Sequence, residues 1–128
     1  MGVDRIPAPS GADRKARTVP LVDNRTEQLI NVLADCVAKC EAWANDCASQ
    51  GNADLAGCIT LCLDCATLCQ VCIPLLARGS QFSAQLCQTF ADACEQCAQA
   101  CEWTGMTECA EAGRRAAEAC RQMAGTAT

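Results

Sequence analysis

Five cysteines at helical spacing in the middle of the chain constrain its fold more than any other feature. Steps of four, three, four and three residues separate Cys58, Cys62, Cys65, Cys69 and Cys72. On a helix of 3.6 residues per turn, these steps place every side chain on one stripe, as in the seam of a coiled coil. Such a stripe normally carries leucine or isoleucine and faces a core. We therefore expect this helix to face its core with sulfur.

Similar stripes run through three further stretches, and together they predict helices over residues 25–50, 53–77, 81–104 and 108–123. Polar residues suited to capping precede the four stretches: Asn24, Asn52, Ser80 and Thr107. All the remaining cysteines also fall on the inward stripes: Cys36, Cys40 and Cys47 in the first stretch, Cys87, Cys94, Cys97 and Cys101 in the third, and Cys109 and Cys120 in the fourth. Random placement would leave several thiols on the solvent face.

The expected fold is all-α: an antiparallel up-down-up-down four-helix bundle with a cysteine-lined core, formed by residues 24–128. The twelve acidic and six basic side chains of residues 25–128 give this bundle an acidic coat. Residues 1–23 are an N-terminal extension, because they contain three prolines, four basic residues and no cysteine. An extended arm and a disordered tail are both open interpretations of this extension.

Composition excludes several classes of function. A net charge of −5 argues against nucleic acid and against an anionic membrane as partners. The chain has no histidine, which excludes histidine-based catalysis and histidine-containing metal sites. Without a catalytic triad, a phosphate-binding glycine loop or a convergent carboxylate pair, we expect no enzyme activity. The N-terminus carries no export signal and no apolar run approaches the length of a membrane span, so the expected compartment is the cytoplasm.

Three interpretations of the cysteines compete. One is inert packing, since a free cysteine behaves as a small hydrophobic residue. The second is a disulfide framework, in which only bridges between helices would form, because Cβ atoms at i and i+4 lie about 5–6 Å apart. The third and favoured interpretation is a metal site. Thiolates without imidazole select soft ions, namely Cu(I), zinc or iron–sulfur clusters.

The continuous ladder of thiols favours several Cu(I) ions over one discrete site. Cu(I) is satisfied by few thiolates, and neighbouring pairs along the helices supply many overlapping sites. Zinc prefers closed tetrahedral sets at loops or helix ends. Iron–sulfur clusters usually use loop spacings such as C-x2-C-x2-C, which this chain lacks, although cysteines from several helices can also enclose a cluster. An iron–sulfur electron-transfer protein is therefore the alternative function.

Over roughly residues 30–123, the sequence resembles the four-helix-bundle copper storage proteins of bacteria. The resemblance rests on Cys36-x3-Cys40, on the five-cysteine stretch and on the run from Ala93 to Glu102. It implies storage of multiple Cu(I) ions on inward-facing cysteines, a homotetramer, and membership of the cytosolic branch. The chain departs from that branch at residues 103–107, which lack the usual histidines, and at Ala112, Ala116 and Ala119, where thiols are expected.

Antiparallel order predicts two layers of the core. Cys47, Cys58, Cys101 and Cys109 should share one layer, and Cys36, Cys69, Phe90 and Cys120 should share another about 16 Å further in. Met106 lies near the first layer and is a candidate entry ligand, because thioethers suit Cu(I); packing on Trp103 is equally open. The N-terminal extension starts at the opposite pole and is expected to cover it. The predicted metal ligands are all fourteen cysteines together with Met106.

Overall fold

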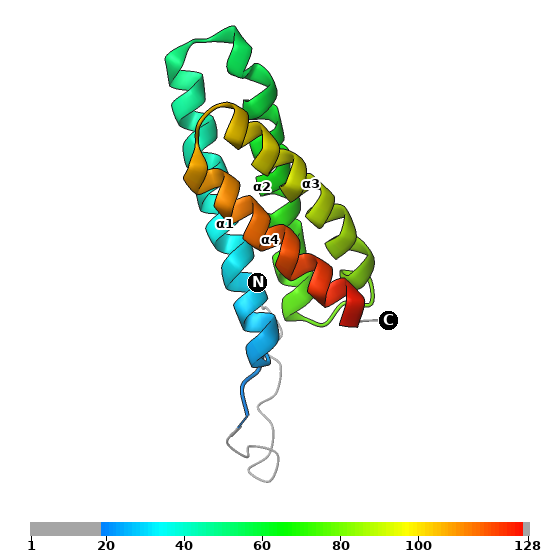
Figure 1. Cartoon of the computed structure of the whole chain (residues 1–128). Coiled ribbons are helices and arrows are strands. Elements are labelled where there is room, and N and C mark those ends of the chain that lie inside the picture. Colours follow the sequence, from blue (N-terminus) through cyan, green and yellow to red (C-terminus); the bar gives the residue numbers. More distant parts are fainter. Residues whose placement is uncertain (1–18, 127–128) are drawn as a thin grey trace, which may run out of the picture.

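The protein is a bundle of four helices arranged as two hairpins (Figure 1). The computed structural model describes residues 19–126, so most of the expected N-terminal extension lies outside the described part. The helices are α1 (Asn24–Gln50), α2 (Ala56–Ala77), α3 (Ser83–Trp103) and α4 (Thr107–Thr126), and a short 3-10 turn, η2 (Ala53–Leu55), precedes α2. The described residues contain no strand. The predicted all-α four-helix fold is confirmed.

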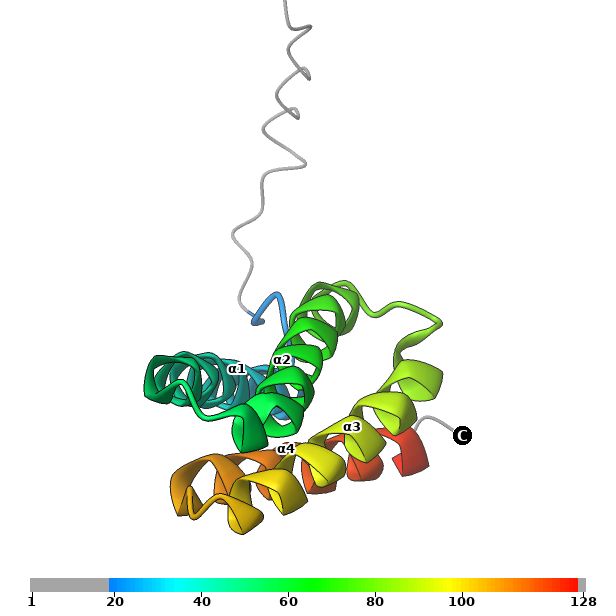
Figure 2. The same cartoon turned by 90° about the horizontal axis from the view of Figure 1, so that it is seen from above.

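The two hairpins form two layers with the core between them. α1 and α2 make one layer and α3 and α4 the other, with α2 packed on α3 and α1 on α4 (Figure 2). At one end of the bundle, the α1–α2 turn extends beyond the α3–α4 turn (Figure 1). We call this end the turn pole, and the end where α1 begins and α4 finishes the terminal pole. All fourteen cysteines are buried between the layers.

The first helix begins one residue earlier than predicted, because Asp23 and not Asn24 is its cap. Asp23 Oδ1 accepts a hydrogen bond from the Thr26 amide at 2.8 Å, which satisfies one of the amides that a helix start leaves unpaired. The helix ends at Gln50, as predicted, where Gly51 adopts a left-handed φ of 64°. That conformation strains residues with a Cβ and favours glycine.

The other helix limits show where local side-chain bonds compete with the helix. Asn52 accepts a hydrogen bond from the Asp54 amide at 3.0 Å and caps η2, so α2 begins only at Ala56. Ser80 accepts from the Phe82 amide at 3.1 Å, and α3 begins at Ser83. Short polar side chains that bind nearby amides favour turns over helix. α4 runs three residues beyond the predicted end at Met123.

α2 has an apolar outer face in addition to its thiol-lined inner face. By length and composition alone, residues 53–77 could cross a membrane, so the expectation that no segment approaches that length is wrong. In the bundle, however, the five cysteines and Ala66 of α2 are buried against the other helices. Leu63 and Val71 are 41% and 48% exposed on the outer side. The core helix of a bundle meets the same compositional criterion as a membrane span.

Small side chains let α3 and α4 pack closely. Ala112 and Ala116, two of the alanines that stand where thiols were expected, are buried, as is Ala98 of α3. At Gly113, an added Cβ would lie 3.0 Å from the Cys94 carbonyl oxygen and 3.3 Å from Ala98 Cβ. The alanines and glycine of α4 therefore form a contact surface for α3, which explains why this helix supplies few thiols.

We expect Gly113→Ala to destabilise the apo-protein by about 1–3 kcal/mol, because the new Cβ would push α4 away from α3. Gly57→Ala is the matched control: nothing lies within 4 Å of an added Cβ there. Alanine's higher helix propensity should stabilise this control by up to about 1 kcal/mol. Urea unfolding of both reduced variants measures the difference. Equal stabilisation by the two substitutions would show that the α3–α4 contact is not tight.

Candidate metal centre

The interior of the bundle offers sulfur and almost no other ligand. All fourteen cysteines are free thiols and buried, and Cys58, at the turn pole, is the most exposed of them at 6%. Among the described residues, Ser83 is the only buried polar side chain. The core therefore contains no carboxylate and no amine that would compete with thiolate for an ion or neutralise its charge.

Ten of the thiols form three groups in which all Sγ atoms lie within 4.8 Å of one another. The inner group is Cys36, Cys65, Cys69 and Cys94; the middle group is Cys40, Cys62, Cys97 and Cys109; and the turn-pole group is Cys58, Cys62 and Cys101. The middle group takes one ligand from each helix. Cys62 belongs to both the middle and the turn-pole group. The contact between Cys36 and Cys40, at 3.9 Å, joins the inner group to the middle group. The groups therefore form one connected set.

Contacts between individual sulfurs follow a path along the bundle axis. Near the turn pole, the path begins with the contact between Cys101 and Cys62, at 3.8 Å. Cys62 contacts Cys97 at 3.5 Å, and Cys97 contacts Cys40 at 3.6 Å. Cys40 contacts Cys36 at 3.9 Å, and Cys36 contacts Cys65 at 3.8 Å. From Cys65 the path continues to Cys94, at 3.5 Å, and from Cys94 to Cys69, at 3.8 Å. No step exceeds 3.9 Å, which allows an ion to pass between neighbouring pairs without leaving sulfur.

α2 and α3 pair their thiols in a regular antiparallel register. Cys62 contacts Cys97 and Cys65 contacts Cys94, so three residues forward on α2 match three residues back on α3. The same register holds seven residues later on α2 and seven residues earlier on α3, where the sulfurs of Cys72 and Cys87 are 3.9 Å apart. The register places Cys69 opposite Phe90, which is completely buried. Phe90 thus occupies the one position of this ladder where a second thiol would stand.

The two predicted layers are only partly formed. Cys58 and Cys101 share a group, as expected, but Cys109 lies one level deeper, with Cys40, Cys62 and Cys97. The reason is visible in Figure 1: the α3–α4 turn stops short of the α1–α2 turn, so α4 begins deeper in the bundle. Cys36 and Cys69 do share the inner group. Cys120 interacts most strongly with Cys87, toward the terminal pole, and more weakly with Cys69 and Cys36.

Comparison with known proteins identifies the family. A family model described as copper storage protein matches residues 22–125. The chain belongs to the copper storage protein family. A search of curated proteins finds no match. Among solved structures, the chain is similar to apo copper storage protein 3 from Bacillus subtilis, with 33% identity, a TM-score of 0.69 and coverage of 77% of this chain and 98% of that one. It is also similar to a crystal structure from Nitrosospira multiformis, with 33% identity, a TM-score of 0.76 and coverage of 82% and 99%.

The geometry of this copper storage family member suits a metal ion with small adjustments. Metal–thiolate bonds are about 2.3 Å long, so two sulfurs that share an ion lie roughly 3.8–4.6 Å apart, depending on the angle between the bonds. The sulfur contacts of the core are 3.5–3.9 Å long. Side-chain rotations that open these contacts by at most about 1.1 Å are therefore enough to admit an ion.

Hydrogen bonds between neighbouring thiols, together with burial, raise the pKa of most of the cysteines. At the turn pole, burial raises the pKa of the Cys47 thiol to about 11, and a neighbouring thiol adds to the effect. An ionised sulfur inside a group is stabilised by the S–H groups around it. Hydrogen bonds from Cys40 and other thiols lower the pKa of Cys36, and hydrogen bonds from Cys101 and others lower the pKa of Cys97. The inner group contains one such sulfur, whereas the middle group contains two, because hydrogen bonds from Cys101 and other thiols also lower the pKa of Cys109, to about 5.

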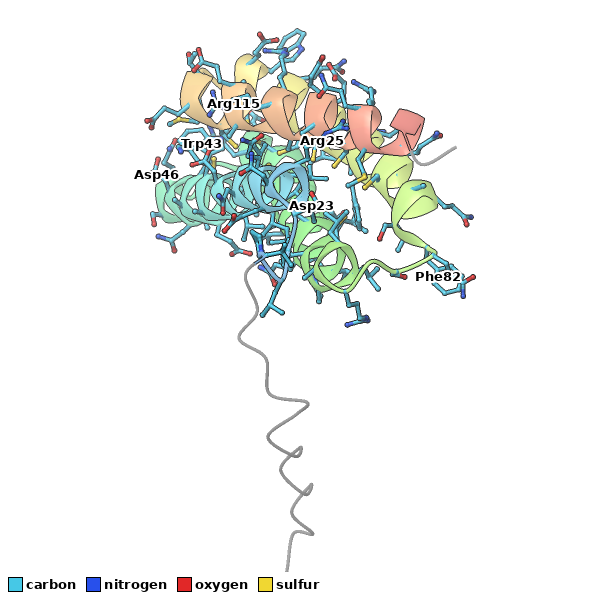
Figure 3. The ribbon with its side chains drawn as sticks, turned by 90° about the horizontal axis from the view of Figure 1, so that it is seen from below. Asp23, Arg25, Trp43, Asp46, Phe82 and Arg115 are labelled. Carbon is cyan, nitrogen blue, oxygen red and sulfur yellow. The ribbon has the colours of Figure 1, made fainter. Side chains whose placement is uncertain are left out.

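A pocket of about 230 Å³ opens between α1 and α4 near the turn pole and reaches the thiol core at Cys109. It is lined by Lys39, Ala42, Trp43, Asp46, Met106, Glu108 and Cys109. Figure 3 shows Trp43 on the side of α1 next to α4. Trp43 Nε1 is buried without a hydrogen-bond partner. Met106 packs against the core, whereas Trp103 is 91% exposed, which favours the pocket over Trp103 as the packing site of Met106.

The sequence pattern identified the thiols but not the polar residues of this pocket. Lys39 lies off the inward stripes, and the sequence marks Glu108 only as one of the acidic side chains of the coat. Neither periodicity nor motif marks them, because the pocket is lined by residues of two helices, α1 and α4, that are far apart in the sequence. Only the relative placement of two helices brings these side chains together.

We expect the apo-protein to lose stability as the pH rises from about 9 to about 11. The raised pKa of Cys47 means that the folded chain holds this proton more tightly than the unfolded chain, whose thiols ionise near 9.0. The resulting stabilisation is complete below that pH and is lost as the pH approaches 11. Urea midpoints across this range test the expectation, with Cys47→Ala predicted to show a smaller decline. A midpoint independent of pH would contradict it.

Proposed function

We propose that this protein stores copper as several Cu(I) ions bound to thiolates inside the bundle. The observation that carries the proposal is the continuous path of sulfur contacts in an interior whose only other buried polar side chain, among the described residues, is Ser83. Soft thiolates favour Cu(I). Each ion displaces thiol protons and balances the negative charge that buried thiolates would otherwise leave unpaired. We propose all fourteen cysteines as ligands.

Two features favour copper over the alternative ions. Four sulfurs within 4.8 Å of one another would also suit a single zinc ion, but the groups share Cys62 and touch at Cys36 and Cys40. Such sharing suits many ions that each use few thiolates. For an iron–sulfur electron-transfer protein, the same contacts are an obstacle, because sulfurs in van der Waals contact leave no room for iron and inorganic sulfide. Membership of the copper storage family points the same way.

The pocket at Met106 is the proposed entry route. It connects the surface with Cys109, a member of the middle group, and its wall carries the Met106 thioether. The carboxylates of Asp46 and Glu108 also line it and favour the approach of a cation. An ion bound first by Met106 would then move to Cys109 and onward along the path of sulfur contacts. No histidine is needed for this route.

The setting that we propose follows the same chemistry. The protein acts in the cytoplasm, where thiols stay reduced, with copper ions as its partners and without nucleic acid, a membrane or a catalysed reaction. A homo-oligomer, a tetramer by resemblance to the family, would cover exposed apolar side chains such as Leu63 and Val71 on the outer face of α2. Residues 1–18 lie outside the described part of the chain, so the expected role of the N-terminal extension as a cover of the terminal pole stays a prediction.

Fully reduced protein should bind several Cu(I) ions per chain, release protons as it does so, and bind more weakly at low pH. An anaerobic titration against a competing Cu(I) chelator, with a pH indicator present, measures all three. Replacing the inner group with serine (Cys36, Cys65, Cys69 and Cys94) should lower the capacity, while circular dichroism still reports a helical chain. Binding of no more than one ion per chain would contradict storage.

Met106→Leu should slow the uptake and removal of Cu(I) several-fold without changing the number of ions bound, because leucine keeps the volume but loses the thioether. Stopped-flow transfer to a coloured Cu(I) chelator measures the rates. Met123→Leu is the matched control, since Met123 lies toward the terminal pole. Equal transfer rates for the two variants would argue that Met106 only packs against the bundle.

A further inference from the structure

Four pairs of thiols face each other across α2 and α3 like the rungs of a ladder. Two of these pairs, Cys62–Cys97 and Cys65–Cys94, have sulfurs 3.5 Å apart, the shortest thiol contacts in the part of the chain that the structure describes. The other rungs are Cys72–Cys87, at 3.9 Å, and Cys58–Cys101, within the turn-pole group. These rungs use every cysteine of the two helices except Cys69.

We propose that the two shortest rungs reduce Cu(II) to Cu(I) before the chain stores it. The proposal rests on the storage function, because the copper must reach the thiol core. Two cupric ions and one facing pair of thiols give two cuprous ions, one disulfide and two protons. Copper gains one electron per ion, the two S–H bonds break, the S–S bond forms, and the protons pass to solvent. The cupric ion is the oxidant, and no other reagent is required.

The arrangement of each four-sulfur group fits this chemistry. The inner group contains the rung Cys65–Cys94 together with Cys36 and Cys69, and the middle group likewise contains one rung and two other thiols. When a rung becomes a disulfide, two free thiols stay within the same group to hold the cuprous product. Thiolate binding favours Cu(I) over Cu(II) and so drives the reduction.

The rungs are the favoured positions for the disulfide. A bond of about 2.05 Å requires sulfurs at 3.5 Å to approach by about 1.5 Å, which rotation of the two side chains on facing helices can provide. Pairs at i and i+4 on one helix are disfavoured by their Cβ separation. The proposed entry pocket reaches Cys109, which shares the middle group with the rung Cys62–Cys97, and a disulfide formed there can move along the sulfur contacts by thiol–disulfide exchange.

The test mixes fully reduced apo-protein with less than one equivalent of Cu(II) sulfate in the absence of oxygen. We expect the electron paramagnetic resonance signal of Cu(II) to disappear and two thiols to be lost for every two ions reduced. Mass-spectrometric mapping after acid quenching should find Cys62–Cys97 and Cys65–Cys94. A persistent Cu(II) signal with all thiols intact, or disulfides at other positions or between chains, would overturn the proposal.

Two double variants separate the rungs from thiol number. Cys94→Ser with Cys97→Ser removes one member of each short rung, whereas Cys36→Ser with Cys40→Ser removes one other thiol from each four-sulfur group. Both variants lose two ligands, but only the first should reduce Cu(II) several-fold more slowly than the wild type. Equal slowing in both variants would contradict the proposal.

Titration of the same wild-type preparation with Cu(I) distinguishes failure of this proposal from failure of the storage function. Normal Cu(I) uptake without Cu(II) reduction would refute only the reduction of Cu(II) by the two rungs. Absence of Cu(I) uptake would refute the storage function.

Discussion

Thiols in a bundle core stay largely neutral when no cation lies beside them, and the design of this protein depends on that property. A neutral cysteine packs like a small hydrophobic residue, so the apo-chain can bury fourteen of them in contact with one another. In the storage function that we propose, the same residues become anionic ligands when a soft cation enters. One set of side chains therefore serves as the hydrophobic core of the empty protein and as the binding surface of the loaded one.

The helices divide two tasks that compete for the same space. α2 and α3 carry nine of the fourteen thiols and face each other at the distance that sulfur contacts require. α4 carries only two, and its small residues, including Gly113, bring it close to α3. Close backbone approach leaves little room for a thiol and an ion. The scarcity of cysteines on α4 thus agrees with its close packing on α3, while Cys109 still contributes a thiol to the middle group.

Sequence reasoning succeeded for the inward stripes and was less accurate at the helix ends. The spacing of the cysteines follows the helical period over many turns, so one phase error would have placed several thiols in solvent, and none is there. Asp23, Asn52 and Ser80 depend on single hydrogen bonds to nearby amides, and such bonds shift a boundary by one to three residues. The spacing of the thiols also gives no sign of the apolar outer face of α2, which makes residues 53–77 apolar enough to meet the criterion for a membrane span.

By itself, the sequence determined that four helices would form and that every thiol would face inward, because both follow from periodicity along a single chain. Only the tertiary structure decided which thiols meet. Cys109 joins Cys40 and not Cys47 because the two hairpins are offset along the bundle axis, and Cys69 faces Phe90 because of the register between α2 and α3. Offset and register arise from side-chain packing between helices. No spacing within one helix specifies them.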